Sequence, residues 1–574
     1  MEKRIERVDN IPLIVHWLKK MGVQETIDNI YVPHGNWEGI SYGQLAVLFL
    51  TYVLHSLNHR LSGMEPWFKK HKTLLEEITG WELSDKDATD DRLGIMCGAF
   101  GECDSKSIEF QENQGRRLIH AYELPTEIFR YDTTSFNVYH DLDKADGGLL
   151  FFGHSKDKRP DLLQFKQGLG TLDPAGVPIV TETIAGNKAD DRCYVPAWRQ
   201  MVRTVGHSDF LYIADCKAAS LESRATIDKN EGYYLFPMPM TGETPEILKE
   251  LVLNPPKEPQ EISLDMALHE KPKIVGKGFE IEKHIEAKLE GENNHEWAER
   301  WFITCSNAHA DRQTKGFEAR LTKAEKQLGN LKPRKGESVA EFSSRAQQVL
   351  KKYKVDGCVN IEVKVTISQE KKYVGKGRPG PNRPFKMVEI RTLKLVYQRN
   401  EEAIEEQMAL FGWRIFVTNT GSDKMTLSQS TLYYRNEWLV ERGFHRFKKG
   451  SIPALPMFLR IAERIKGLML LLTVALQAIT LLEFTARKEL EKNNEKIAGL
   501  VPGNPKMKTD RPTAERLLSQ FDNLHLLIEG SEKQESGCIL EKLTPLQKRI
   551  LALLKIPESI YELTFNRIKL VNCS

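Results

Sequence analysis

Hydrophobic and polar positions follow different periods along the chain, and each period predicts a different kind of element. Over the first 125 residues the apolar positions recur at helical spacing, most clearly in ISYGQLAVLFLTYVLHSL, which begins at Ile40. Ser41, followed three residues later by Gln44, is the capping-box pattern that opens a helix. We therefore expect a helical region at the N-terminal end of the chain.

Between residues 126 and 240 the pattern changes to short runs rich in aromatic and β-branched residues, which are typical of strands. The strand candidates are EIFRYDTTSFNVYH, GLLFFGHS (residues 148–155), the two halves of LLQFKQGLGTLDPAGVPIVTETIAGN, DFLYIADC and GYYLFPMPM. Helical patterns, YVPAWRQMVRTVG and LESRATIDKN, separate the last three runs. Several strands followed by alternating helices and strands predict an α/β fold with a mixed sheet, in the order of a ribonuclease-H-like core.

A second kind of pattern interrupts this core from about residue 241 to residue 405. It contains strand candidates, two amphipathic helices, and a pair of strand-like runs joined by VGKGRPGPNRPF, which together predict a large α+β insertion that is rich in strands. The run RIFVTNT, residues 414–420, is expected to return to the core. The expected domains are a helical N-terminal accessory or DNA-binding domain at 1–125, the first part of the core at 126–240, the insertion at 241–405, the second part of the core at 406–490, and a linker with a small helical C-terminal segment at 491–574.

Composition changes this outline little. The chain has 82 Lys and Arg against 79 Asp and Glu, so any basic surface must be local. Its cysteines are scattered without a CxxC motif, and no secretory signal is visible, which favours a reduced, cytoplasmic protein. The apolar run at 467–482 is shorter than the roughly 20 residues of a membrane span and contains Thr473 and Gln477, so we expect a buried helix and no membrane.

Two acidic residues stand out among the predicted strands of the core. Asp132 lies within the first strand, where an aspartate is disfavoured and costs free energy if it is buried without a partner. Asp215 follows the apolar run of the strand DFLYIADC, at the end where open α/β sheets tend to bind ligands. In the proposed topology this strand and the first strand are neighbours, so we expect Asp132 and Asp215 to face each other.

A third acid lies on a predicted helix with an unusual stripe of side chains. Within TLYYRNEWLVERGFHRFKKG, residues 431–450, Tyr434, Glu441 and Lys448 are seven residues apart. On one continuous helix they would share a face. Each acid taken singly has a simpler explanation, since a strand-end Asp is usually a turn residue and Glu441 could pair with His445.

Together, the three acids predict a metal site. Carboxylates held close together raise one another's pKa unless a cation neutralises them, and ligation by oxygen alone favours Mg²⁺ or Mn²⁺. Two such ions about 4 Å apart would activate a water or a DNA 3′-hydroxyl and stabilise the leaving oxygen of a phosphodiester. We therefore expect Asp132, Asp215 and Glu441 to be both the catalytic residues and the metal ligands.

At these positions the chain resembles the DDE-type insertion-sequence transposases whose third acid lies in a helix of the form Y-x2-R-x3-E-x6-K. YDTTSF carries the first acid, YIADC the second, and YYRNEWLVERGFHRFK the third. The segment at 155–191 also resembles the family's core sequence between the first two acids, and the N-terminal region resembles its accessory domain. Position 437 departs from the pattern, because it is Glu437 where the family has Arg.

The resemblance implies a transposase that uses two Mg²⁺ or Mn²⁺ ions to cleave the inverted-repeat DNA at transposon ends and to transfer the 3′-hydroxyl to target DNA. It also implies a homodimer when two ends are paired, associated with the nucleoid when bound to DNA. The expected DNA contacts lie on the Glu441 helix and the basic stretch that begins there; they are Tyr434, Arg435, Arg446, Lys448 and Lys449.

Two other functions remain open from the sequence. One is a ribonuclease-H-like nuclease that hydrolyses DNA without joining it. The other is a non-catalytic DNA-binding protein derived from a transposase, which the glutamate at position 437 favours. A weaker DNA-binding motif is KGRPGP, residues 376–381, which resembles a minor-groove hook but is also typical of a Gly/Pro hairpin loop.

Overall fold

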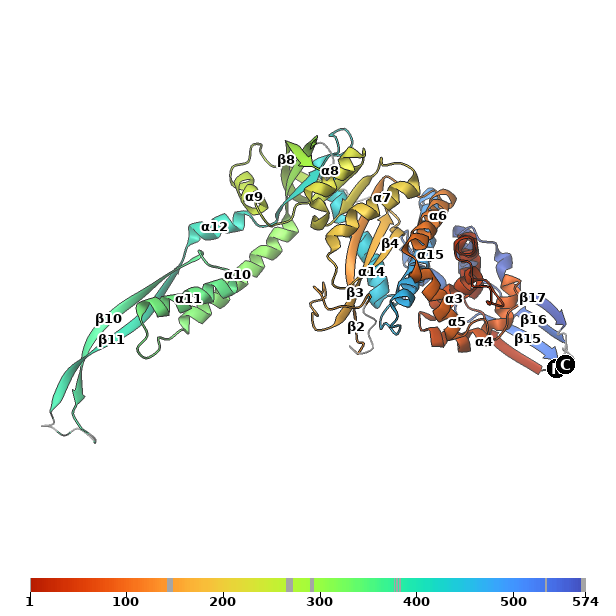
Figure 1. Cartoon of the computed structure of the whole chain (residues 1–574), viewed down its shortest axis with the longest axis horizontal. Helices are drawn as coiled ribbons and strands as arrows, with labels where there is room; N and C mark the ends of the chain where they lie inside the picture. Colours follow the sequence, from red (N-terminus) through yellow and green to blue (C-terminus); the bar gives the residue numbers. More distant parts are fainter. Residues whose placement is uncertain are drawn as a thin grey trace.

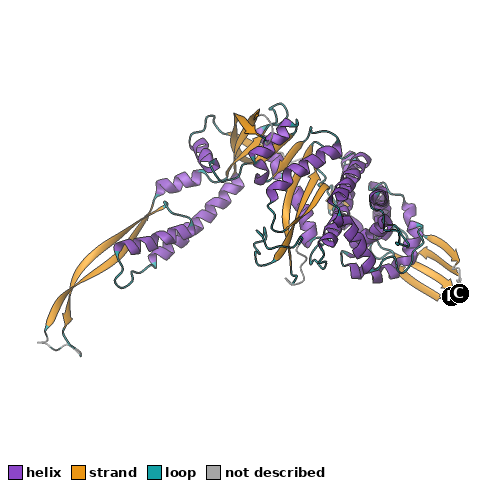
Figure 2. Cartoon of the chain, viewed as in Figure 1, coloured by secondary structure: helices purple, strands orange, loops and turns teal. Residues whose placement is uncertain are grey.

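The structure is a computed structural model that describes residues 2–141, 148–264, 272–289, 294–375, 377, 380, 384–531 and 534–568. Its N-terminal region is helical, as predicted, and packs at one end of an elongated molecule (Figures 1 and 2). The helices are α1 (Ile11–Lys20), α2 (Val23–Ile30), α3 (Tyr42–Ser56), α4 (Leu61–Thr79), α5 (Asp90–Glu102) and α6 (Asp104–Tyr122). Helix α3 begins with the expected capping box, in which the Ser41 hydroxyl accepts a hydrogen bond from the Gln44 backbone N–H.

The long helix α15 (Ala462–Lys492) joins these helices to the rest of the protein. Two glycines permit its close contact with α5, because a Cβ at Gly467 would lie 1.9 Å from the Cys97 carbonyl oxygen and one at Gly101 would lie 1.9 Å from the Glu463 carbonyl oxygen. Among the described residues α15 is the one helix long and apolar enough to cross a membrane, and 94% of its most apolar window is buried inside the protein. Its apolar composition is therefore explained by its position as the central helix of the core.

A nine-stranded mixed sheet forms the middle of the molecule. In spatial order its strands are β4 (Val177–Ala185), β3 (Leu163–Leu172), β2 (Ile128–Val138), β5 (Leu211–Ala214), β6 (Tyr233–Pro237), β12 (Trp413–Thr418), β9 (Asn294–Ser306), β8 (Lys273–Lys288) and β7 (Gln260–Leu264). Strands β2, β5 and β6 are parallel to one another, and the other neighbours are antiparallel. The helices α7 (Tyr194–Val205), α8 (Leu221–Lys229) and α9 (Thr244–Leu253) connect its strands. The prediction of an α/β fold with a mixed sheet is confirmed.

The sheet differs from the sequence prediction in two respects. The run at 148–155 is not a strand where it is described, and only Phe151 forms an isolated bridge, with Gln164. Half of the predicted insertion does not form a separate unit, because β7, β8 and β9 continue the central sheet through β12. The alternating apolar positions of β9 allowed a strand to be predicted but did not indicate which sheet it would join.

The other half of the insertion extends away from the sheet as a limb (Figure 1). Helices α10 (Asn307–Gly329) and α11 (Val339–Tyr353) lie at its base, and α12 (Glu401–Ala409) leads back to β12. Between α11 and α12 the strands β10 (Val359–Tyr373) and β11 (Phe385–Arg399) form a two-stranded antiparallel sheet. We call the pair β10–β11 the ribbon.

The C-terminal segment is less helical than predicted. Strands β15 (His525–Ser531), β16 (Gln534–Ile539) and β17 (Thr564–Ile568) form a four-stranded sheet with β1 (Glu2–Arg7), so the two ends of the chain lie together (Figure 1). The expected linker contains the short pair β13 (Ile497–Ala498) and β14 (Lys508–Thr509), followed by α16 (Ala514–Leu518). Only α17 (Pro545–Leu553), in LTPLQKRILALLKI, matches the helix that was predicted there.

Candidate active site

The first two predicted acids lie on neighbouring strands. Strand β2 pairs with β5 in parallel register, with Tyr131 opposite Ala214, so Asp132 and Asp215 are the next residues on the two strands. Asp132 lies inside the long strand β2, whereas Asp215 ends β5 and caps the following turn, where its carboxylate accepts a hydrogen bond from the Lys217 backbone N–H at 3.0 Å. Because β5 ends at Ala214 while β2 continues to Val138, β2 has no paired strand on the β5 side from Asp132 onward.

Each of these carboxylates has one further polar partner. The Lys156 ammonium lies 3.3 Å from Asp132, whose side chain is 19% exposed. The Tyr194 hydroxyl donates a hydrogen bond of 2.5 Å to Asp215. Burial raises the pKa of Asp132 above its usual value, with Lys156 opposing the rise and Asp215 adding to it. The two acids thus interact electrostatically, and the single lysine does not compensate for their burial.

Sequence reasoning missed both Tyr194 and Lys156. Tyr194 is the first residue of α7, and burial strongly raises its pKa, so it remains a hydroxyl donor toward Asp215. Lys156 follows the run that was predicted to be a strand and lies in a loop whose course the local pattern does not determine. Tyr194 belongs to no motif, and the resemblance of the segment at 155–191 gave Lys156 no role, so only the folded chain brings the two residues to the acids.

The third acid, Glu441, lies on a helix that differs from the predicted one. The segment forms two helices, α13 (Leu427–Arg435) and α14 (Trp438–Lys449), separated by Asn436 and Glu437. Prediction of one continuous helix was therefore wrong, and Tyr434 does not share a helix with Glu441. The N–H of Glu437 bonds to the Tyr434 carbonyl, three residues back, which is the tighter spacing expected at a helix end.

Helix α14 packs on the side of the sheet to which Asp132 points. Leu169 of β3 is paired with Asp132 across the antiparallel strands, so both side chains leave the sheet on the same face. A Cβ at Gly443 would lie 2.8 Å from the Leu169 side chain, which shows how closely α14 approaches β3 at this level. Glu441, which is exposed, lies in the first turn of this helix, two residues before Gly443.

A fourth carboxylate, Glu437, lies among the three predicted acids. It is the residue that replaces the arginine of the family pattern. Burial, followed by repulsion from Asp132, Glu441 and Asp215, raises the pKa of Glu437 to about 7, and a hydrogen bond from Tyr434 opposes this rise. The position therefore adds negative charge to the site rather than a cation.

Of the five predicted DNA-contacting residues, two are exposed and three are packed against or paired with other side chains. Arg435 and Lys449 are exposed. Tyr434 is half-buried against Phe416 of β12, and Lys448 pairs with Asp157 at 3.0 Å.

Arg446 lies in the interior and is 4% exposed. Its guanidinium contacts Glu483 of α15 at 2.5 Å and Glu515 of α16 at 3.1 Å. This placement does not present Arg446 to DNA; instead the side chain fastens α14 to the core. The motif KGRPGP falls partly outside the described residues, so its structure is not assigned.

The donor set suits a hard divalent cation, because every candidate ligand is a carboxylate oxygen and the group carries excess negative charge. Within the described residues, however, no three Asp, Glu, His or Cys side chains are close enough together to hold one ion. The chemistry of the residues fits Mg²⁺ or Mn²⁺, and closing the set around an ion requires side-chain movement, for which exposed Glu441 has the most freedom.

Comparison with known proteins does not assign a family. No protein-family model matches the chain, and no curated protein sequence matches it. One solved structure with which it aligns is the piggyBac transposase synaptic complex with hairpin DNA, at 9% identity and a TM-score of 0.33, over 89% of this chain and 80% of that one. Similarity at this level does not establish a shared fold or a shared function.

Proposed function

We propose that this protein is a metal-dependent DNA transposase with a ribonuclease-H-like core. The observation that carries the proposal is the meeting of Asp132 and Asp215 on adjacent parallel strands, beneath the helix that bears Glu441. Acids from three distant segments on one face of a sheet are costly for stability, as the raised pKa of Asp132 indicates. A reaction that needs bound cations gives a reason for them to be there.

In this proposal Asp132, Asp215 and Glu441 hold two Mg²⁺ or Mn²⁺ ions. Such ions lower the pKa of a water or hydroxyl nucleophile and stabilise the leaving oxygen of a phosphodiester. Tyr194 would fix the carboxylate of Asp215 through its short hydrogen bond. Lys156 would neutralise Asp132 until a cation replaces it.

The DNA partners would be transposon-end inverted repeats and target DNA. Arg435 and Lys449, the last residues of α13 and α14, are exposed and could neutralise backbone phosphates. A homodimer is expected when two ends are paired, because joining both ends to one target needs two active sites. These assignments, and a cytoplasmic location, follow from the proposed reaction and from the resemblance in the three acid motifs.

The test uses a duplex taken from the sequence that flanks the coding region. Wild-type protein with Mg²⁺ should nick this duplex and produce joined strands with a target plasmid. Asp132→Asn should reduce both products about a thousand-fold or more while duplex binding in EDTA persists. The matched control is Asp161→Asn, since Asp161 pairs with Arg159 on the surface. Wild-type cutting by the Asp132→Asn protein would contradict the assignment.

The same assay separates the two alternative functions. Nicked DNA without joined product identifies a nuclease, and the absence of Mg²⁺-dependent nicking identifies a non-catalytic DNA-binding protein. Glu437 is the residue that favours the second alternative, because it places a fourth carboxylate where the family pattern has a cation.

A further inference from the structure

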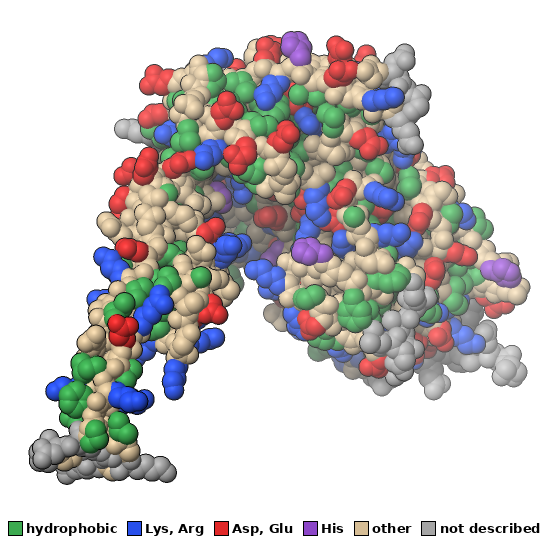
Figure 3. Space-filling model, turned by 60° about the vertical axis from the view of Figure 1, so that its left-hand side comes forward, with side chains coloured by type: hydrophobic (Ala, Val, Ile, Leu, Met, Phe, Trp, Pro, Cys, Tyr) green, Lys and Arg blue, Asp and Glu red, His purple; other side chains and the backbone are tan. Residues whose placement is uncertain are grey.

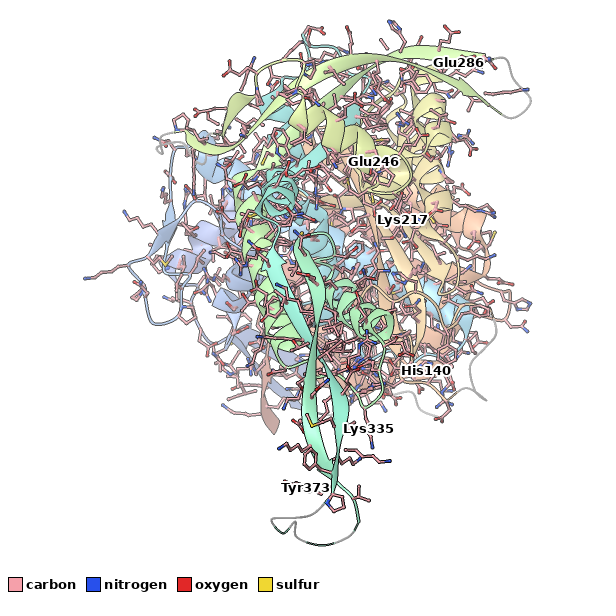
Figure 4. The ribbon with its side chains drawn as sticks, turned by 90° about the vertical axis from the view of Figure 1, so that its left-hand side faces the viewer. His140, Lys217, Glu246, Glu286, Lys335 and Tyr373 are labelled. Carbon is pink, nitrogen blue, oxygen red and sulfur yellow. The ribbon has the colours of Figure 1, made fainter. Side chains whose placement is uncertain are left out.

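The ribbon has an outer half without any covering element. Its pairing runs from Val359 opposite Arg399 to Tyr373 opposite Phe385. At the inner end Val359 is buried with residues of α10 and α11. Beyond Val365 the ribbon extends from these helices with both faces open, and Tyr373 lies near its outer end (Figure 4).

One face of the ribbon carries two pairs of lysines, and within each pair the two positive charges face each other across the strands. Lys364 lies directly opposite Lys394, and Lys372 lies directly opposite Lys386, all four on the same face of the ribbon. All four side chains are exposed. Like charges directly opposite each other destabilise a strand pair. The isolated protein therefore bears a cost at this face that a bound anion would relieve.

The surrounding charges do not cancel these lysines. On the face that bears the four lysines, the described residues from 364 to 394 include one acid, Glu370, so the formal balance of that face is 4 − 1 = +3. Among the described residues the one ion pair formed by the four lysines is that of Lys364 with Glu362, at 4.0 Å. The face is thus free to neutralise an external anion.

We propose that the basic face of the ribbon binds the phosphate backbone of duplex DNA. Lys364 and Lys372 are eight residues apart, about 26 Å along a strand, which is most of the roughly 34 Å of one DNA turn. The major groove of DNA is wide enough for a two-stranded ribbon. This inference rests on the proposed function only in taking DNA as the partner, and it places a DNA contact on a limb away from the acids. Lys and Arg side chains also border the hollow between this limb and the body (Figure 3).

The opposite face of the ribbon carries exposed apolar side chains beside Lys371, Glu389 and Arg391, and these apolar side chains define the competing occupant. Ile367 and Met387, on that face, are 63% and 50% exposed. Such a surface could pack against a second copy of the chain. A second copy would not relieve the repulsion between the lysine pairs, because its own ribbon has the same charges. The lysines therefore favour DNA, and the second copy becomes an outcome of the test.

The experiment measures the salt dependence of binding to a mixed-sequence DNA duplex of about three turns, in EDTA. The full-length protein carries Asp132→Asn, so no cleavage occurs. The test variant adds Lys364→Gln, Lys372→Gln, Lys386→Gln and Lys394→Gln. Since each phosphate contact contributes about 0.9 to the slope of log K against log salt, the slope should decrease in magnitude by about 3 to 4.

Two variants control for charge and for folding. Lys86→Gln, Lys506→Gln, Lys508→Gln and Lys542→Gln remove the same charge from exposed lysines elsewhere and should leave the slope unchanged. Arg in place of the four ribbon lysines should keep it. An unchanged slope in the ribbon variant, or an equal change in the control, overturns the proposal. If Ile367→Asp with Met387→Asp then dissociates an oligomer, the ribbon is a protein interface.

The result is independent of catalysis. A decreased slope in the ribbon variant, together with no Mg²⁺-dependent cleavage by the wild-type protein, would reject the transposase and retain the ribbon contact. Cleavage and joining by the wild-type protein, together with an unchanged slope in the ribbon variant, would retain the transposase and reject the ribbon contact.

Discussion

The carboxylate of Glu483 on α15 holds α14 in place, and its removal is the sharpest test of how the site is built. Glu483 is 1% exposed. One of its oxygens accepts hydrogen bonds from Arg442 at 2.6 Å, from Arg446 at 2.5 Å and from the Ala514 backbone N–H at 3.0 Å. Arg487 lies 3.2 Å from the other oxygen. Both Arg442 and Arg446 belong to the helix that carries Glu441.

Replacing Glu483 by Ala should destabilise the fold by about 3 kcal/mol, at the lower end of the 3–5 kcal/mol seen when a buried ion pair loses one partner. The lower end applies because the arginines are trapped to different degrees. The side chains of Arg442 and Arg487 are 27% and 25% exposed and can turn toward water, whereas the side chain of Arg446 is 5% exposed and keeps only Glu515.

The cost therefore belongs mainly to Arg446, which makes a double-mutant cycle informative. Adding Arg446→Met removes the stranded guanidinium, so the double variant should cost clearly less than the sum of the two single variants. Hydrogen exchange of the α14 backbone should increase in Glu483→Ala and partly recover in the double variant. Thermal unfolding and exchange mass spectrometry measure the two effects. Glu491→Ala, an exposed position on the same helix, is the matched control. If Glu483→Ala behaves like this control, α14 is not held as argued.

Three further predictions concern packing and pH. Gly443→Ala should leave the free energy of unfolding nearly unchanged, since a gain in helix propensity of about 1 kcal/mol offsets close contacts with the movable ends of Leu169 and Leu476. Gly443→Val should cost about 1–3 kcal/mol and reduce cleavage. Equal melting temperatures and cleavage rates for the two variants would contradict this. Burial lowers the pKa of His59 to about 4, so the unfolded chain takes up a proton near pH 6.5 before the fold does, and stability should fall by about 3 kcal/mol as pH drops from 6.5 toward 4. His59→Asn should reduce this pH dependence of the melting temperature. The same pH dependence in the variant and the wild-type protein would show that protonation of His59 does not destabilise the fold. Burial alone would raise the pKa of Asp190, but Lys166 and Lys217 outweigh the effect of burial and hold this pKa at about 2. Asp190→Asn should therefore cost about 3 kcal/mol of stability at pH 7, with Asp191→Asn, at an exposed position, as the control. Equal unfolding midpoints for the two variants would refute this prediction.

The sequence predicted most reliably those elements whose pattern is local. The helices of the N-terminal region, the buried helix at 467–482 and most strands of the sheet follow from apolar spacing and turn residues. The adjacency of β2 and β5 followed from the topology assumed for a ribonuclease-H-like order. In contrast, GLLFFGHS has strand composition but forms one isolated bridge at Phe151, because composition does not supply a pairing partner.

Features that depend on distant partners were not predictable. The heptad spacing of Tyr434 and Glu441 suggested a shared helical face, but the chain breaks at Asn436 and Glu437, where no proline or glycine marks a stop. Arg446 belongs to a basic run that reads as a DNA contact, yet its partners are 37 and 69 residues away. The strands β15–β17 pair with the other end of the chain, which no local period indicates.

The acidic site carries a net negative charge that must be neutralised before DNA can bind there in the proposed function. Asp132, Asp215, Glu437 and Glu441 influence one another, and among the described residues Lys156 is the ion-pair partner found for this group. Four carboxylates and one lysine give a formal charge of −4 + 1 = −3, and the raised pKa values of Asp132 and Glu437 make the charge at neutral pH less negative than this. A phosphodiester cannot approach such a group without additional cations. DNA engagement at the acids should therefore need a divalent cation, whereas binding at the ribbon lysines should not, and this difference lets the two contacts be measured separately on one protein.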